Sequence, residues 1–328
     1  SFLPFGTSRC AVVGETPWSP FRCEVVHLIS AGLLKVRATL SDGCLGAIDV
    51  DLQRPAVTQL FHGRSPDVVV KLVPSLYTIC AQAQTAAARA ALAVAAEVEL
   101  PTVDDGALWV ETLHEHLWRL LLDWPPALGL PPAKAEFIAW RAARFGGSCA
   151  EETHKLMEGT LYELAEKCLE KLVDRNNEVG AAGLTPGLET DEWLGIWRDT
   201  GELPAVQLAP PSLGAAYRTR INEVERAAAA LTSGACFPLS SAGGDGWGVA
   251  QTLTARGVLT HAVHLDAGKI AKYRVLAPTD AFFANAGALA GLLGSRRFDS
   301  TDDARRMFDQ AVLALDPCVP YVLELYDA

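Results

Sequence analysis

The sequence has 328 residues, of which half are apolar and 20% are charged, and its formal net charge is −11. This acidic balance argues against nucleic acid and anionic membranes as main partners, because both attract basic surfaces. No stretch reaches the roughly 18 uninterrupted apolar residues of a membrane-spanning helix, and no secretory signal is recognised near the start. The eight cysteines form no CxxC pair, so we expect reduced thiols in a cytoplasmic protein.

The predicted elements change in character along the chain. Strands are expected at 25–29, 33–40 and 45–50, with a hairpin turn at 41–43. Helices are expected at 66–98 with a break near Pro74, then at 104–123, 132–145, 150–175 and 212–232. Residues 247–277 alternate as strands do, and a last helix over about 301–314 follows a capping serine at 300.

Together these elements predict an α+β, mostly helical fold with small β-sheets near the N- and C-terminal parts. We expect a single domain over 1–328, made of a small β region at 22–60, a helical region at 66–232, and a region of strands and loops with a C-terminal helix at 245–328.

Some local patterns are weak indicators of function. The glycine-rich segment 243–248 lacks the GxGxxG spacing of a dinucleotide-binding loop, and no P-loop motif occurs. His114-Glu115-His116 resembles a metal-binding cluster, but residues i and i+2 of a helix do not share a face, so a solvated helix face is favoured.

Two ExxH units leave an enzyme hypothesis open. Residues i and i+3 do share a helix face, and two such units with two further glutamates can build a di-iron carboxylate site. The residues concerned are Glu111, His114, Glu151 and His154, with Glu136 and Glu166 as the further carboxylates.

More specific segments follow one another along the chain. LFHGRSPD at 60–67 leads to YTIC at 77–80, and HEHLWRLLLDW at 114–124 follows. TARGVLTH at 254–261 precedes DAGKI at 266–270, then Tyr273 and Pro278-Thr279, and DPCVPY occupies 316–321. Taken alone, Cys318 in this last segment is best interpreted as a buried structural thiol.

In this order the segments resemble those of NiFe-hydrogenase large subunits. That family carries a GRDP-like segment before RICGxC, a helix ending in LDW, then PRGxLxH and DGKIxxYxxxxPT, and finally DPCxxC. The similarity covers about 60–90, 108–124 and 245–321, whereas 130–245 does not align. The resemblance implies a large-subunit-like helical bundle in which 245–328 contributes to a cofactor site.

The departures from the family concern nickel. In the family, two CxxC pairs supply four thiolates, and all of them bind nickel. Cys80 and Cys318 match the first members of the pairs, but Ala83 and Tyr321 replace the second. The histidines that follow are replaced by Ala87 and Glu324. Since nickel in such a site needs soft thiolates, no nickel and no hydrogen activation are expected.

The iron side of the family's site is better retained. In the family the second cysteine of each pair also bridges to iron, and with those two replaced we expect Cys80 and Cys318 to bind the Fe(CN)2CO unit, iron with two cyanides and one carbon monoxide. The resemblance also implies that Arg256 and Thr279 donate hydrogen bonds to the cyanides, because anionic acceptors favour such donors. Asp316 and His261 are expected around these residues.

The sequence keeps the hydrogen-bond donors that surround the iron unit and has lost nickel ligands. In this combination it resembles the HupK/HoxV type of hydrogenase expression/formation protein. The implied function is a maturation scaffold, not an enzyme, that passes Fe(CN)2CO to the NiFe-hydrogenase large subunit. HypC/HypD-type maturation chaperones are the expected further partners. The alternatives are a large-subunit-mimicking binding module without metal and the di-iron protein. A metal-free respiratory subunit of the same superfamily is disfavoured, because it is not expected to keep the DPC cysteine.

Overall fold

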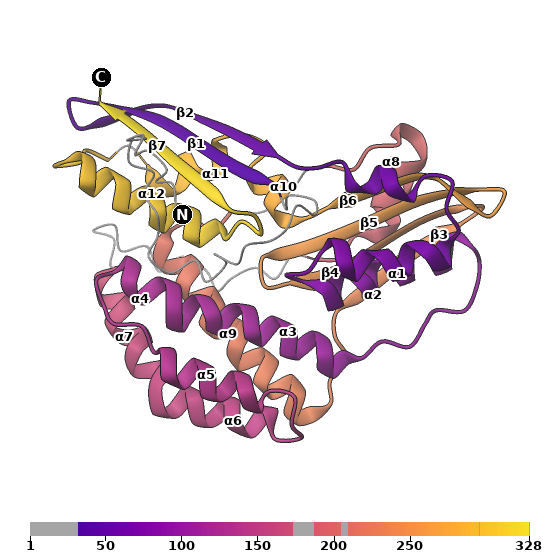
Figure 1. Ribbon diagram of the computed structural model, residues 1–328, viewed down its shortest axis with the longest axis horizontal. Helices are drawn as coiled ribbons and strands as arrows, with labels where there is room; N and C mark the ends of the chain where they lie inside the picture. The colour runs from indigo at the N-terminus through magenta and orange to yellow at the C-terminus, as the bar shows by residue number, and fades with distance from the viewer. Residues whose placement is uncertain (1–31, 173–186, 205–208, 295, 328) are drawn as a thin grey trace, which may run out of the picture.

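The computed structural model describes residues 32–172, 187–204, 209–294 and 296–327, which form two β-sheets with helices packed around them (Figure 1). The strands are β1 (Leu33–Ser41), β2 (Cys44–Gln53), β3 (Leu239–Gly244), β4 (Trp247–Thr254), β5 (Gly257–Asp266), β6 (Lys269–Leu276) and β7 (Tyr321–Asp327). The helices are α1 (Pro66–Leu76), α2 (Ala81–Ala95), α3 (Asp105–Trp118), α4 (Trp124–Ala127), α5 (Lys134–Ala143), α6 (Cys149–Leu156), α7 (Tyr162–Lys171), α8 (Thr190–Thr200), α9 (Leu213–Ser233), α10 (Pro278–Phe282), α11 (Gly287–Leu293) and α12 (Thr301–Leu315).

The first sheet joins distant parts of the chain in the order β2-β1-β7. The hairpin between β1 and β2 turns through Asp42 and Gly43, whose φ angles of 50° and 73° suit an Asp-Gly type I′ turn. β7 runs parallel to β1, and Leu34 pairs with Tyr321. Alternate residues of β1 are buried over α12 (Figure 1), so this sheet fixes the loop that lies just before β7.

The second sheet is an antiparallel meander in the order β3-β4-β5-β6. The alanine-rich helix α2 packs on one face, beside Ala250 and Val263. α8 covers the other face, where Trp197 packs on Val249. α2 lies so close to the sheet that a β-carbon on Gly248 would stand 2.2 Å from a backbone oxygen of α2. The glycines of segment 243–248 therefore form a tight turn between β3 and β4 and, because they lack side chains, allow α2 to pack close to the sheet.

The helices α3 to α7 and α9 form a bundle below the first sheet, whereas α1 packs beside α2 (Figure 1). α3 and α9 pack side by side, and α4, α6, α7 and α12 also contact α9 or its neighbours. The core between them is apolar and includes Leu113, Leu117, Tyr217 and Val224. Two π-helical turns, Arg119–Asp123 and Met157–Leu161, continue α3 and α6 without a break in the helical path.

The predicted α+β, mostly helical class is confirmed, with corrections in detail. The first long helix breaks at residues 77–80 and not at Pro74, because a proline near the last turn of α1 removes only one backbone hydrogen bond. β3, β7, α8, α10 and α11 were not predicted, and the strand expected at 25–29 lies outside the described residues. None of the described helices is long and apolar enough to cross a membrane.

Candidate functional site

The fold brings Cys80 and Cys318 into one site. Cys80 directly precedes α2, and Cys318 lies in the loop between α12 and β7. Both side chains are partly buried, and both are free thiols. Cys318 lies close enough to Cys80 for its charge to shift the pKa of the Cys80 thiol. The charges of Arg256 and Glu111 also shift this pKa. Two thiols from distant segments thus share one electrostatic environment.

Cys318 is held by three hydrogen bonds. Its backbone N–H donates to Thr279 Oγ1 at 3.1 Å, and the Thr279 hydroxyl lies 3.3 Å from Cys318 Sγ. Arg54 Nη2 donates to the same sulfur at 3.2 Å and also forms an ion pair with Asp280. Thr279 is fully buried at the start of α10. The Cys318 sulfur therefore has one charged and one neutral donor already aimed at it.

Cys80 has a different environment without a charged hydrogen-bond donor to its sulfur among the described residues. Burial, and then the negative charge of Cys318, raise the pKa of the Cys80 thiol to about 12, although Arg256 acts in the opposite direction. Gln84 Nε2 lies 3.6 Å from Cys80 Sγ. Glu111 caps the start of α2 by accepting from the backbone N–H groups of Gln82 and Ala83 at 2.8 and 3.0 Å.

Arg256 lies in the two-residue turn between β4 and β5, where it is only 8% exposed. Its Nε donates to the Asp316 carbonyl oxygen at 3.0 Å, and its Nη2 donates to Glu115 Oε2 at 2.8 Å. Its Nη1 is buried and has no hydrogen-bond partner among the described residues. A buried guanidinium N–H without a partner is costly unless an acceptor arrives.

Asp316 organises the charges behind this arginine. It ends α12 in the left-handed conformation with φ 48°. Its carboxylate accepts from Arg119 at 2.8 Å and from Arg220 at 3.2 Å, and Arg256 lies 3.4 Å away. Burial alone would raise the pKa of Asp316, but the three guanidinium groups hold it well below its usual range. Asp316 is thus an anion at neutral pH.

The positions that differ from the nickel-binding pattern have other contacts here. The Ala83 N–H is bound by Glu111, and the Tyr321 hydroxyl donates to Asp309 at 3.3 Å. Ala87 is buried in the core, and Glu324 pairs with Arg37 across the first sheet. The part of the chain that the structure describes contains no group of three or more His, Cys, Asp or Glu side chains suited to a metal ion.

That finding contradicts the di-iron hypothesis. Glu111 caps α2, and Glu151 pairs with Lys155 on the exposed face of α6, so the two ExxH units do not converge. The solvated face predicted for 114–116 is also wrong. His116 is 3% exposed, and burial lowers its pKa to about 3, while Arg220 lies 3.4 Å from its Nδ1.

Some residues of the site were not predicted. Arg54, Gln84, Glu115, Arg119 and Arg220 all contact the predicted residues. Glu115 and Arg119 lie in the segment that ends in LDW. Because they are four residues apart, they share one face of the predicted helix, and this pair of charges could have indicated that the face belongs to the site. Arg220 lies in the stretch that does not align with the family, and no sequence signal marks it.

The comparisons with known proteins agree with the family resemblance and with the fold. No protein-family model matches the chain. The hydrogenase expression/formation protein HupK of Azotobacter vinelandii is 32% identical over 91% of this chain and 100% of its own length. HupV of Azotobacter chroococcum mcd 1 is 30% identical over 91% and 100%. HoxV of Cupriavidus necator is 25% identical over 84% and 92%.

Solved structures show the fold alone, because their sequence identity is low. The Ni-Fe-Se hydrogenase of Desulfovibrio vulgaris Hildenborough in the reduced state has a TM-score of 0.60 at 12% identity, over 84% of this chain and 94% of that chain. The as-isolated oxidised state of the same enzyme has a TM-score of 0.59, also at 12% identity, over 83% and 93%. The predicted hydrogenase large-subunit-like fold is thereby confirmed.

Proposed function

Because this chain belongs to the HupK family of hydrogenase expression/formation proteins, we propose that it is a maturation scaffold that carries the Fe(CN)2CO unit as cargo. Cys80 and Cys318 are the proposed iron ligands. The observation that carries this proposal is the buried Arg256 Nη1, which has no partner among the described residues and lies in the environment of both thiols.

The donor set fits such a cargo. Cyanide nitrogens are anionic acceptors, and a guanidinium N–H in a water-poor site is a strong donor to them. Asp316 and Glu115 hold the other nitrogens of Arg256, so the free N–H is fixed in direction. Thr279 is the proposed second cyanide donor, with its hydroxyl now on Cys318. Asp316 and His261 are proposed to support these residues and not to bind iron.

The proposed transfer follows from what the site lacks. Two thiolates can hold iron, but Ala83 and Tyr321 offer no sulfur for nickel. The unit therefore stays without its second metal, and both cysteines are only partly buried, so they remain open to exchange. We propose that HypC/HypD-type chaperones deliver the unit in the cytoplasm and that the NiFe-hydrogenase large subunit receives it. The chain itself is proposed to catalyse no reaction.

The test is an anaerobic infrared spectrum of the protein purified from cells with intact hydrogenase maturation. We expect cyanide and carbonyl stretches that disappear in Cys80→Ser and in Cys318→Ser and persist in Cys236→Ser, which changes an exposed thiol between α9 and β3. No bands in the wild type would overturn the proposal. If maturation still required the metal-free protein, the binding-module alternative would replace it.

A further inference from the structure

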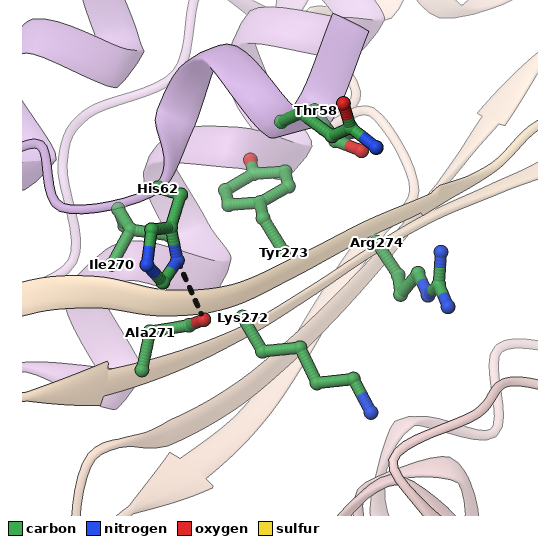
Figure 2. Close-up of a pocket in the computed structure, with 8 residues that line it drawn as sticks. Thr58, His62, Ile270, Ala271, Lys272, Tyr273 and Arg274 are labelled. Carbon is green, nitrogen blue, oxygen red and sulfur yellow. Dashed lines mark hydrogen bonds between the residues drawn. The ribbon is translucent and has the colours of Figure 1, made fainter. Parts of the chain in front are cut away.

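A line of buried hydrogen bonds connects Cys80 with a pocket on the surface. Gln84 Nε2 lies 3.6 Å from Cys80 Sγ, and Gln84 Oε1 lies 2.8 Å from His261 Nε2. His261 Nδ1 lies 2.8 Å from the Tyr273 hydroxyl. These three side chains are 2%, 0% and 5% exposed. Tyr273 also lines a pocket beside His62, as Figure 2 shows.

The elements that carry the three groups explain their alignment. Gln84 lies in the first turn of α2, four residues after Cys80, and therefore on the same face of the helix. α2 packs on the sheet that carries His261 in β5 and Tyr273 in β6. Phe61 packs edge-on against the Tyr273 ring at 4.9 Å and limits its movement. The line is therefore fixed by the contact between helix and sheet.

With Gln84 Nε2 placed on the sulfur, the position of every other proton in the line follows. An amide has its donor and its acceptor on opposite sides, so Gln84 Nε2 on the sulfur leaves Oε1 for His261. His261 Nε2 must then carry a proton. Burial lowers the pKa of His261 to about 3, so the ring is neutral and Nδ1 accepts from Tyr273. Each group donates in one direction, from Tyr273 through His261 and Gln84 to the sulfur.

We propose that Tyr273, His261 and Gln84 form a one-way relay of donors that positions the Cys80 sulfur for iron. This inference rests on the proposed function. The reverse direction would need a proton on Cys80 Sγ for donation to Gln84, and a sulfur bound to iron carries none. Hydrogen bonds linked in series polarise and strengthen one another. Tyr273 therefore strengthens the hydrogen bond from Gln84 to the Cys80 sulfur without touching that sulfur. Cys318 has Arg54 for this purpose, whereas Cys80 has a neutral chain.

The relay assigns roles to Gln84 and Tyr273 that a merely structural polar network would not have. A structural network would affect only stability and side-chain order. A donor on a metal-bound sulfur also reduces the charge that the sulfur gives to iron. The carbonyl stretch of the bound unit reports this charge, since more charge on iron lowers the stretching frequency.

The experiment compares Gln84→Met and Tyr273→Phe with Gln82→Met, which removes an exposed glutamine from the same turn of α2. Long-range ¹H–¹⁵N spectra of histidine-labelled protein, prepared without the maturation machinery, report the tautomer of His261. We expect a proton on Nε2 in the wild type and in Gln82→Met, and a mixture of tautomers in Gln84→Met.

Infrared spectra of the iron-carrying proteins give the second readout. We expect the carbonyl band to move to lower wavenumber in Gln84→Met, to move less in Tyr273→Phe, and to stay in place in Gln82→Met. A His261 proton on Nδ1, or an unmoved band in Gln84→Met, would overturn the relay and leave the scaffold intact. No bands in any of these proteins would remove the scaffold, and the tautomer would still decide the direction of the relay.

Discussion

Replacement of Asp316 by asparagine tests the charge cluster behind the site. Asparagine has nearly the same shape and tolerates the left-handed backbone at this position, so the change isolates the charge. The wild-type carboxylate is 2% exposed and accepts from Arg119 and Arg220. In the variant, an amide N–H₂ must face one of these guanidinium groups, and donor then meets donor.

The expected loss of unfolding free energy is about 3–5 kcal/mol, the usual cost of removing one partner from a buried ion cluster. It is large because Arg220, whose side chain is 6% exposed, loses its carboxylate partner, and Arg119 and Arg256 are left with one carboxylate each, Asp123 and Glu115. Such a loss is a substantial part of the roughly 5–15 kcal/mol that stabilises a typical domain.

Urea unfolding under reducing conditions, followed by circular dichroism, measures this loss. Asp49→Asn is the matched control, because Asp49 pairs with Arg37 at the surface with its side chain 65% exposed. This control is expected to unfold at the wild-type midpoint, since exposed pairs contribute little. A loss in Asp316→Asn below about 1 kcal/mol, the size of a single neutral hydrogen bond, would refute the reasoning.

Three further predictions concern the site and the sheet. Arg54→Gln removes the charged donor to Cys318, so the protein is expected to lose iron roughly 10- to 100-fold more readily to an anaerobic chelator. Burial raises the pKa of Glu111 from 4.5 to about 7, so the contribution of Glu111 to stability should fall as pH rises between these values, where only the folded state keeps the proton; His116 and His261, with lowered pKa values of about 3, act in the opposite direction up to their usual value of 6.5. Urea midpoints between pH 4.5 and 6.5 should therefore rise more steeply with pH in Glu111→Gln than in the wild type. Gly248→Ala should destabilise by about 1–3 kcal/mol in the same assay, because its methyl group meets the Ala91 carbonyl.

Each of these predictions has an outcome that contradicts it. Wild-type iron retention in Arg54→Gln would show that Thr279 alone suffices for Cys318. The same pH dependence in Glu111→Gln and in the wild type would show that Glu111 does not keep its proton in the folded state. Gly159→Ala is the control for the glycine variant, since a β-carbon there meets nothing within 4 Å, and equal losses in the two variants would contradict the packing argument.

The fold was predictable where its determinants are local. Asp42-Gly43 between two apolar runs predicts the hairpin of β1 and β2, and Ser300 predicts the start of α12. β7 was missed because its partner is β1, and no local pattern records a pairing between strands so far apart. The burial of His116 was missed for a similar reason, since Arg220 covers it from another helix.

The candidate site was predictable only through its resemblance to a family. Spacing alone leaves Cys318 an ordinary buried thiol, and only the order of several motifs connects it with Cys80. The order of the motifs could not predict the residues that contact the two cysteines. Arg54 and Gln84 lie outside the family's ligand motifs, and their roles depend on where a strand end and a helix face come to lie.

The parallel pairing of β1 with β7 has a consequence for synthesis. A ribosome releases β1 and Cys80 early, but β7 and Cys318 emerge only after all the other described elements. Until then β1 keeps one unpaired edge, which is exposed to wrong pairings. The two thiols also cannot meet before Cys318 has emerged. Any cargo that needs both thiols can therefore be accepted only after α12 and Cys318 have been synthesised, so loading follows nearly all of the described elements.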